Sequence, residues 1–262
     1  MKHELHRMTW KEAEAAFQED PVVIIPLGSM EQHGPHGPMG DYQAAAEVAL
    51  RVAKNTGSYC IPTLPFGYSE YFRGFPGTVS LTAETVKAAV LDICDCLFEH
   101  GLTRLVFFNG HAGNAPVLDR ASRIMRRTHK RMVPALNLWQ MLTPEFKKEL
   151  YKEQFNPSGH GAEPMTSVMM YLTPDDMRMD LLGTVRSNKE WNGFPIVSFA
   201  KAKLKDTEVA LYFDMDEMSP DGVMGNPLAG SAENGEAIIN KVVEYGTAFV
   251  EMFKKADTAV RK

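Results

Sequence analysis

Two carboxylates and two histidines lie within eleven residues in the segment GSMEQHGPHGPMGDYQAAAE, which covers positions 28–47. They are Glu31, His33, His36 and Asp41. A further histidine, His111, stands in a second short motif, NGHAGN, among glycines that let the backbone bend closely. Carboxylate oxygens and imidazole nitrogens form a mixed ligand set that suits zinc, manganese or iron, including sites that hold two ions. These residue types indicate metal-assisted hydrolysis.

Each of these residues also has a structural alternative. Asp41 stands directly before a predicted helix and could cap its first turn. His36 follows Pro35 and could support a ligand, face a substrate or be structural. A single histidine after a strand is usually a loop residue, so the metal interpretation depends on finding two such motifs at matching places in the fold.

The elements around the motifs supply that placement. Apolar segments too short for helices and rich in β-branched residues predict buried strands at 21–29, 58–65, 103–111 and 131–141. Amphipathic segments between and after them predict helices at 9–20, 41–57, 80–101, 114–129 and 231–255. This alternation is typical of an α/β fold with a mostly parallel sheet covered on both faces, here one domain over residues 1–262. Ligands bind outside the carboxyl ends of such strands, where both motifs stand.

Composition excludes several classes of protein. The 262 residues carry a net charge of −5, and the only dense basic cluster, residues 126–131, stands at a predicted helix end, so nucleic acid is not an expected partner. Three cysteines and no apparent signal peptide indicate a reducing, cytoplasmic location. No apolar run approaches the ~20 residues that span a bilayer. The polar segment 143–159 is expected to be an irregular flap.

Five segments along the chain form a recognisable set. They are PLGSMEQHGPHGPMGD, GFPGT at 74–78, NGHAGN, HGAEPMTS at 160–167 and GVMGNPLAGSAENGE at 222–236. Taken together, they resemble the creatininase family of creatinine amidohydrolase-like, metal-dependent hydrolases. The resemblance implies a three-layer α/β/α fold, a centre of two divalent ions (zinc or manganese, with iron as a further option) and a homo-oligomer, often a hexamer. It also implies that Glu31, His33, Asp41 and His111 are the ligands, with Asp41 bridging the ions.

The chain departs from the family pattern around the second ion. Creatininase has a glutamate at the position of Gly113, so another carboxylate is needed here, and Glu163 is the expected replacement. Otherwise Glu163 is a first-turn charge of a helix at 163–172, which the helix dipole favours. Many relatives carry a second glutamate where this chain has Met165.

The resemblance implies hydrolysis of a small, polar cyclic substrate, most often at a C–N bond of a cyclic amide, amidine or formamide. We expect His160 to transfer a proton to the leaving group, because a neutral histidine titrates in a suitable range. Otherwise His160 is a flap residue that is hydrogen-bonded to the backbone. The other expected catalytic residues are His36 and Glu163, and the expected substrate contacts are Tyr68, Tyr71, Arg73 and Trp139. The alternatives are C–C hydrolysis that opens a keto-inositol ring in carbohydrate catabolism and, less favoured, a metal-binding oligomer without activity.

Overall fold

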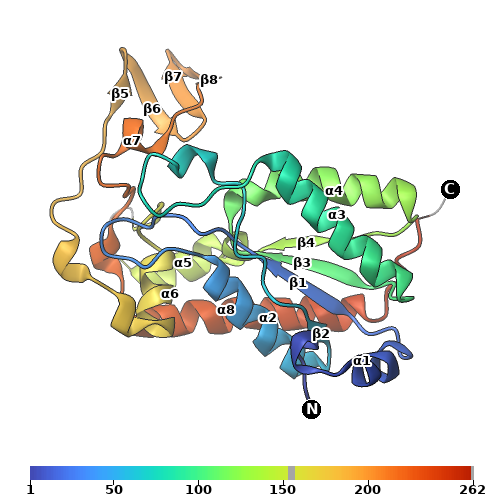
Figure 1. The fold of residues 1–262 in the computed structure, drawn as a ribbon. Coiled ribbons are helices and arrows are strands. Elements are labelled where there is room, and N and C mark those ends of the chain that lie inside the picture. Colours follow the sequence, from blue (N-terminus) through green and yellow to red (C-terminus); the bar gives the residue numbers. More distant parts are fainter. Residues whose placement is uncertain (153–156, 261–262) are drawn as a thin grey trace.

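The computed structural model describes residues 1–152 and 157–260. At its centre is a parallel sheet in the order β2-β1-β3-β4 (Figure 1). Strands β1 and β3 pair in register from Val23 opposite Leu105 to Leu27 opposite Asn109. Both are fully buried, as expected for strands covered on two faces. The bounds are Val23–Leu27 for β1, Tyr59–Cys60 for β2, Leu105–Asn109 for β3 and Ala135–Asn137 for β4.

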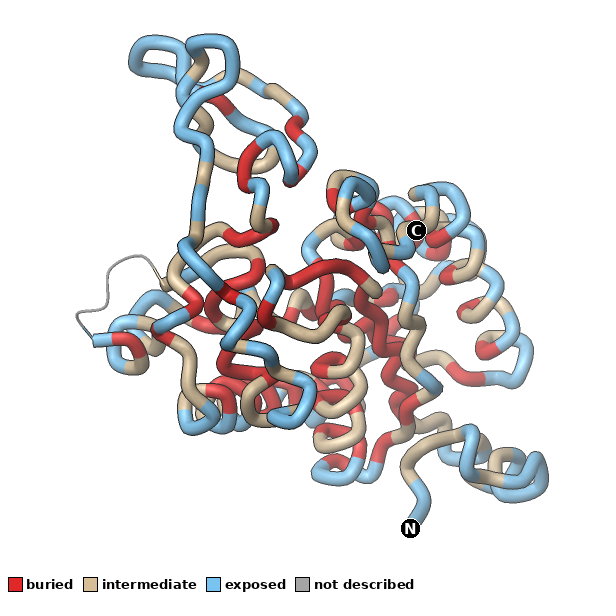
Figure 2. The backbone as a smooth tube through the Cα atoms, turned by 60° about the vertical axis from the view of Figure 1, so that its left-hand side comes forward, coloured by how far each residue is buried: buried red, intermediate tan, exposed pale blue. Residues whose placement is uncertain are grey.

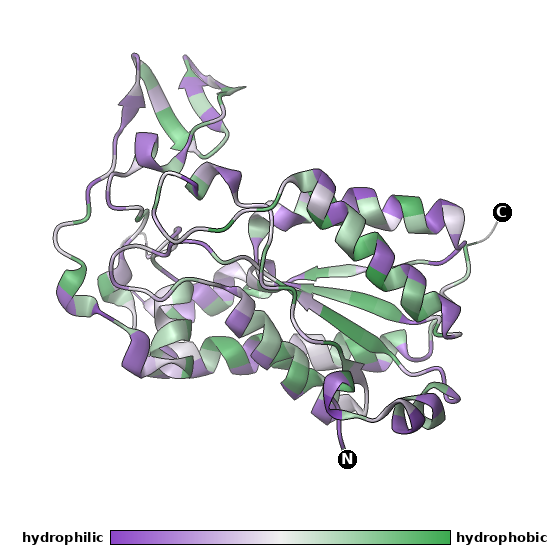
Figure 3. Ribbon diagram, viewed as in Figure 1, coloured by the Kyte–Doolittle hydropathy of each residue, from purple (hydrophilic) through white to green (hydrophobic). Residues whose placement is uncertain are grey.

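Alternate residues of these strands enter two separate hydrophobic cores. Ile24, Val106 and Phe108 pack toward α2 (Tyr42–Thr56), α6 (Met165–Leu172) and α8 (Ala232–Phe253). Their neighbours Val23, Ile25, Leu105 and Phe107 pack toward α3 (Ala83–Glu99) and α4 (Ala115–Thr128) on the opposite face. Figure 3 shows the apolar strands between these two helical layers. The predicted α/β/α fold with a mostly parallel sheet is confirmed.

The predicted helices form where their end signals place them. Thr9 begins α1 (Trp10–Phe17) with a capping box to Glu12. Thr82 accepts a hydrogen bond from the backbone N–H of Thr85 at the start of α3. Gly57 ends α2 in the left-handed conformation, with φ of 64°. No helix among residues 1–152 and 157–260 is both long and apolar enough to cross a membrane.

Several segments differ from the prediction. The strands predicted at 58–65 and 131–141 pair in the sheet only over Tyr59–Cys60 and Ala135–Asn137, and Leu138–Met141 forms a 3₁₀ helix.

The expected flap at 143–159 contains helix α5 (Pro144–Tyr151), which Thr143 caps, although positions 153–156 of that segment lie outside the described residues. A second, antiparallel sheet was not predicted. It projects from the main body near the short helix α7 (Met215–Met218), and most of it is exposed (Figures 1 and 2). Its strands are β5 (Glu190–Trp191), β6 (Phe194–Ser198), β7 (Lys201–Leu204) and β8 (Thr207–Ala210).

The small sheet has a core of its own. Ala202, Phe213 and Met218 form a separate buried cluster at its base. The strands are only two to five residues long, and β5, β7 and β8 carry charged side chains, so these three lack the apolar runs that revealed the central strands. The apolar β6 follows Asn192-Gly193, a hairpin-turn signal that the sequence analysis did not use. Whether the whole chain folds as a single unit stays a prediction.

Candidate metal centre

The loops that follow β1 and β3 leave the same edge of the central sheet, because Leu27 and Asn109 lie opposite each other at the strand ends. These loops bring Glu31, Asp41 and His111 together in the interior. The Nδ1 atom of His111 lies 3.1 Å from Oε1 of Glu31 and 3.1 Å from Oδ2 of Asp41. The sequence motifs thus converge as their positions predicted.

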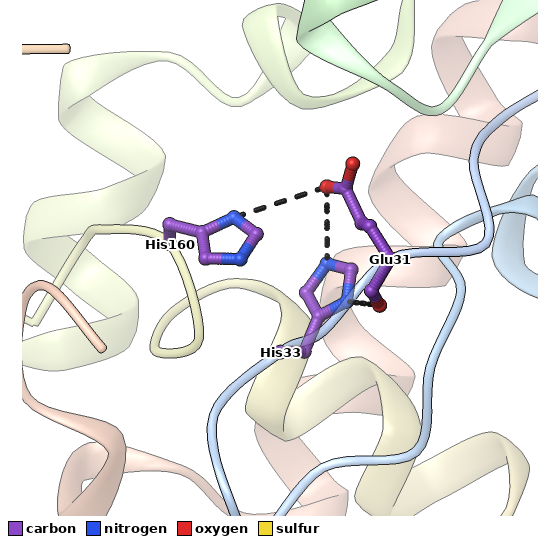
Figure 4. Close-up of side chains that lie close together, drawn as sticks. All are labelled: Glu31, His33 and His160. Atoms are coloured by element: carbon purple, nitrogen blue, oxygen red, sulfur yellow. Dashed lines mark hydrogen bonds and ion pairs between the residues drawn. The ribbon is translucent and has the colours of Figure 1, made fainter. Parts of the chain in front are cut away.

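A second group of donors meets the same glutamate. Nε2 of His33 lies 4.0 Å from Oε1 of Glu31, and Nδ1 of His160 lies 3.9 Å from that oxygen (Figure 4). Glu31, His33 and His160 form one trio, and Glu31, Asp41 and His111 form the other. Within each trio the donor atoms lie within 4.8 Å of one another, which is close enough for all three to reach one ion.

Backbone carbonyl groups orient all three histidine rings. A carbonyl oxygen only accepts, so the ring nitrogen facing it carries the hydrogen, and in a neutral ring the other nitrogen is then free to bind a metal. In each case that other nitrogen is the one that faces Glu31. The anchoring distances are 3.1 Å from His33 Nδ1 to the Glu31 carbonyl, 2.9 Å from His111 Nε2 to the Tyr68 carbonyl and 2.6 Å from His160 Nε2 to the Gln32 carbonyl.

The charges of this cluster favour a cation. Burial disfavours protonation of His111, but the carboxylates of Glu31 and Asp41 outweigh it and raise the pKa of His111 well above its usual value. Oε2 of Glu31 has no hydrogen-bond partner among the described residues, although Glu31 is only 1% exposed. Buried carboxylates need a compensating charge. A divalent cation supplies more charge than the His111 proton and displaces that proton on binding, so the donor set fits a divalent metal.

The alternative that the Asp41 carboxylate caps α2 is wrong. Asp41 occupies the N-cap position, but its side chain makes no capping hydrogen bond. Its Oδ1 atom accepts from the backbone N–H of Ser29 at 2.6 Å, so the carboxylate points back toward the loop after β1. Gly28 makes this approach possible, because a Cβ atom there would overlap Oδ1 of Asp41 and lie 2.5 Å from Cα of Tyr42.

Glu163 lies near the cluster but outside both trios. Its Oε1 accepts from the backbone N–H of Ser167 at 3.1 Å, and its Oε2 accepts from the Ser167 hydroxyl at 2.6 Å and the Tyr151 hydroxyl at 2.9 Å. Burial raises the pKa of Glu163, although these hydrogen bonds oppose the shift. The contacts explain its burial without a metal, and its role as a ligand stays a prediction.

A cavity of about 330 Å³ opens beside the cluster, and four aromatic side chains wall it. Tyr71 and Trp139, both expected to contact substrate, are two of them, together with Phe72 and Phe199. The indole N–H of Trp139 donates to the Gly110 carbonyl at 2.5 Å, so this residue lines the cavity with its apolar ring and not with a free N–H group. Phe199 lies in the turn between β6 and β7, and the sequence analysis did not single it out.

The remaining expected substrate contacts do not reach this cavity. Arg73 is exposed, and Tyr68 contributes its backbone carbonyl to His111 rather than its ring to the cavity wall. The hydroxyl of Tyr71 makes no hydrogen bond to the rest of the described chain, so it is free to bind a ligand. Burial raises the pKa of Tyr71 and the carboxylates of Glu31 and Asp41 raise it further, which keeps the hydroxyl protonated.

His36 is buried beside the cavity wall without lining it. Its Nε2 atom lies 3.1 Å from Oγ1 of Thr166 at the start of α6, and its Nδ1 atom has no partner among the described residues. Burial, and next the charge of His33, lower its pKa to about 4. The neutral ring links the loop after β1 to α6, and its catalytic role stays a prediction.

Residues 6–250 match the family model described as Creatininase, creatinine amidohydrolase. The chain belongs to the creatininase family. Creatinine amidohydrolase of Pseudomonas putida is 35% identical over 189 residues, which cover 66% of this chain and 73% of the relative. The mycofactocin precursor peptide peptidase of Mycolicibacterium smegmatis is 29% identical over 238 residues, which cover 85% of this chain and 81% of that relative. The 3-dehydro-scyllo-inosose hydrolase of Thermotoga maritima is 27% identical over 256 residues, which cover 91% of this chain and 79% of that relative.

Solved structures agree with this assignment. A creatininase structure described as the Mn form superposes with a TM-score of 0.78 at 29% identity, covering 97% of this chain and 99% of that one. A creatininase variant described as of Zn–Zn type has a TM-score of 0.77 at the same identity and coverage. The protein is therefore a metal-dependent hydrolase of the creatininase family.

Proposed function

We propose that this creatininase-family protein hydrolyses a C–N bond in a small cyclic substrate, with divalent ions held by Glu31, His33, Asp41 and His111. The observation that carries the proposal is the position of their donor atoms, which face one side of an aromatic cavity of about 330 Å³. A purely structural metal site is closed by protein ligands. The open space beside this cluster therefore supports catalysis over a metal-binding oligomer without activity.

The cavity favours a compact, uncharged or cationic substrate. Its volume lies at the lower end of the range for small-molecule sites, roughly 300–1,000 Å³. Among the described residues that line it there is no lysine or arginine to pair with a phosphate or carboxylate group. Aromatic walls suit a flat ring. A polyol needs more hydrogen-bond partners than these walls offer, which supports a cyclic amide over a keto-inositol.

We propose two ions, zinc or manganese, with iron also compatible with the nitrogen and oxygen donors. The solved creatininases described as Mn and Zn–Zn forms support this choice. When bound, such ions make water more acidic, to a pKa of about 7, and polarise a carbonyl oxygen. The chain's own part is to hold the ions on oriented ligands, to exclude bulk water with Phe72, Trp139 and Phe199, and to donate a hydrogen bond from Tyr71.

The second candidate is C–C hydrolysis of a keto-inositol ring. It is supported by the Thermotoga maritima relative named as an inosose hydrolase, which matches 91% of this chain. The relatives named as peptide peptidases add a peptide bond to the substrates worth testing. A homo-oligomer, hexameric as the family resemblance implies, and a cytoplasmic location also stay predictions.

The test begins with metal analysis of protein purified without chelator, followed by assays after reconstitution with zinc or manganese. The substrates are creatinine, other cyclic amides, a keto-inositol and a short peptide. We expect about two ions per chain and turnover of a cyclic amide. A metal-loaded protein that opens only the keto-inositol would select the second candidate. Loaded protein that is inactive on all four classes would contradict the proposal, and chelated protein is the negative control.

A further inference from the structure

The small antiparallel sheet presents one of its turns to the cavity. Its strands pair in the order β5-β6-β7-β8, so successive turns lie at alternate ends of the sheet. The turn of Phe199 and Ala200 therefore lies at the opposite end from the other two turns. We propose that Phe199 sets the upper size limit of the substrate, so that a flat, unsubstituted ring fits and a bulky substituent or a peptide does not. The inference rests on the proposed function, because it takes this cavity to be the substrate site.

The ring of Phe199 packs on both aromatic residues of the 3₁₀ turn Glu70–Phe72. Its centroid lies 5.2 Å from that of Tyr71 and 5.4 Å from that of Phe72, and the second contact is edge-to-face at 82°. The ring of His160 lies 6.2 Å away at 87°. Such aromatic pairs are favourable beyond the area that they bury. Phe199 is thus held in the cavity wall, although its backbone belongs to the small sheet.

The strand before this turn is irregular. The pairing of β6 with β7 shifts by one residue between Ile196 and Ser198, which is the pattern of a β-bulge. Bulges occur often beside active sites, where they bend the strand and redirect a side chain. The turn is also unlike the common two-residue hairpin, because neither Phe199 nor Ala200 has a positive φ. Both features bear on where the side chain of Phe199 points.

The base of the small sheet is fixed against the segment that forms the neighbouring wall. Helix α7 packs beside the 3₁₀ turn Glu70–Phe72, and a Cβ atom on Gly74 would lie 2.9 Å from Oδ2 of Asp216. Both methionines of α7 are fully buried. The backbone N–H of Phe213, a member of the small core, donates to the Phe199 carbonyl at 3.1 Å. The turn is therefore anchored, and Phe199 is a fixed part of the wall.

The other three aromatic walls have further contacts at the metal cluster. Phe72 stacks on His160 with centroids 4.0 Å apart. The indole N–H of Trp139 is hydrogen-bonded to the loop after β3. Tyr71 carries the hydroxyl that we expect to donate to the substrate. Phe199 has none of these tasks, so a change in the size of its side chain leaves the ligands and their supports in place.

The space that remains beside Phe199 decides which substrates fit. With its ring in place the cavity measures about 330 Å³, which suits a small ring. One methylene group in an apolar pocket changes discrimination between substrates by roughly 10–200-fold. A benzyl substituent adds more than that and needs the volume that the phenyl ring of Phe199 fills. Removing this phenyl ring from the protein should therefore make room for the same group on the ligand.

Binding of a graded series of cyclic amides tests the size limit. Metal-loaded wild type, Phe199→Ala and Phe199→Leu are titrated with hydantoin, methylhydantoin and benzylhydantoin by calorimetry. Wild type should bind hydantoin most tightly. In Phe199→Ala the Kd of benzylhydantoin relative to that of hydantoin should fall by at least about 10-fold. Phe199→Leu should lie between, and it keeps an apolar contact with the small core if the alanine variant fails to fold.

Leu204→Ala is the matched control, because Leu204 is exposed at the far end of β7. It should keep the wild-type order of Kd values, and every variant should keep the wild-type metal content. An unchanged order in Phe199→Ala would overturn the inference. Equal weakening of all three ligands in both Phe199 variants would also overturn it, since Phe199 would then be a structural residue. Failure of every protein to bind any of the three ligands would count against it too, because the enlarged cavity would admit nothing.

Turnover by wild type separates this inference from the proposed function. If wild type hydrolyses a cyclic amide while Phe199→Ala keeps the wild-type order of Kd values, only the size limit fails. If wild type hydrolyses no substrate while Phe199→Ala gains affinity for benzylhydantoin, the proposed function fails and the size limit stands.

Discussion

The carboxylate of Glu163 accepts two hydrogen bonds from Ser167, one from its backbone N–H at 3.1 Å and one from its hydroxyl at 2.6 Å. These bonds join the segment before α6 to the helix itself. Replacing Glu163 with alanine should lower the free energy of unfolding by about 1–3 kcal/mol, because buried donors lose their acceptor. Denaturant unfolding checks this loss of stability. Metal analysis of the same variant tests the predicted ligand role separately: loss of one ion would support Glu163 as a ligand, and an unchanged metal content would leave it only as a structural acceptor.

The raised pKa of Glu163 makes the stability of the fold depend on pH. Burial makes the folded state hold the carboxyl proton more tightly than the unfolded chain does, in which the pKa of this group is near 4.5. The folded state then binds more protons, so the free energy of unfolding decreases as pH rises from 4.5 through the folded pKa. Glu163→Gln should lose this part of the decrease. Unfolding of apo-protein at several pH values tests it, and parallel curves for the two proteins would contradict it.

His111→Ala should release metal and abolish turnover, since its ring provides the only nitrogen in its trio. Metal analysis and an activity assay on the same preparation measure both effects. His129→Ala, which removes a histidine far from the cavity, should behave as wild type. Full occupancy in His111→Ala would remove His111 from the ligand set.

Removing the ions should destabilise the fold as well as stop catalysis. A ligand present at 100 times its dissociation constant stabilises a protein by about 2.7 kcal/mol. Without the ions, only the His111 ring compensates the neighbouring carboxylates of Glu31 and Asp41, which adds to the effect of losing the metal. Chelated protein should therefore melt at a lower temperature, and added Zn²⁺ or Mn²⁺ should restore the original transition. Mg²⁺, which prefers oxygen donors, serves as the control ion.

Tyr71→Phe should lower kcat while leaving metal content unchanged. If its hydroxyl donates to an oxygen that gains negative charge, its loss should cost about 10²-fold in kcat, the lower end of the range for such donors. KM should change far less than kcat. Tyr212→Phe is the matched control, because Tyr212 is 86% exposed. A rise in KM alone would make Tyr71 a contact for the ground state of the substrate.

Much of the fold and of the donor cluster could be predicted because the signals are local. The apolar runs of β1 and β3 identify buried strands, and residues that follow parallel strands must meet at one edge, which placed His33 near His111. Tyr68 and Arg73 were placed less well because they flank a 3₁₀ turn, where neighbouring side chains point in different directions. Phe199 was missed although Asn192-Gly193 is a hairpin-turn signal in the sequence, because nothing local shows that the following turn of this sheet reaches the cavity.

Because Phe199 lines the cavity, metal binding and the shaping of the substrate cavity depend on different parts of the fold. The ion ligands belong to the central body, whereas one wall of the cavity comes from a sheet with its own small core. Substitutions in the turn between β6 and β7 can reshape the space above the ions while every ligand keeps its support. Substrate selectivity can therefore change between relatives without disturbing the residues that bind the ions.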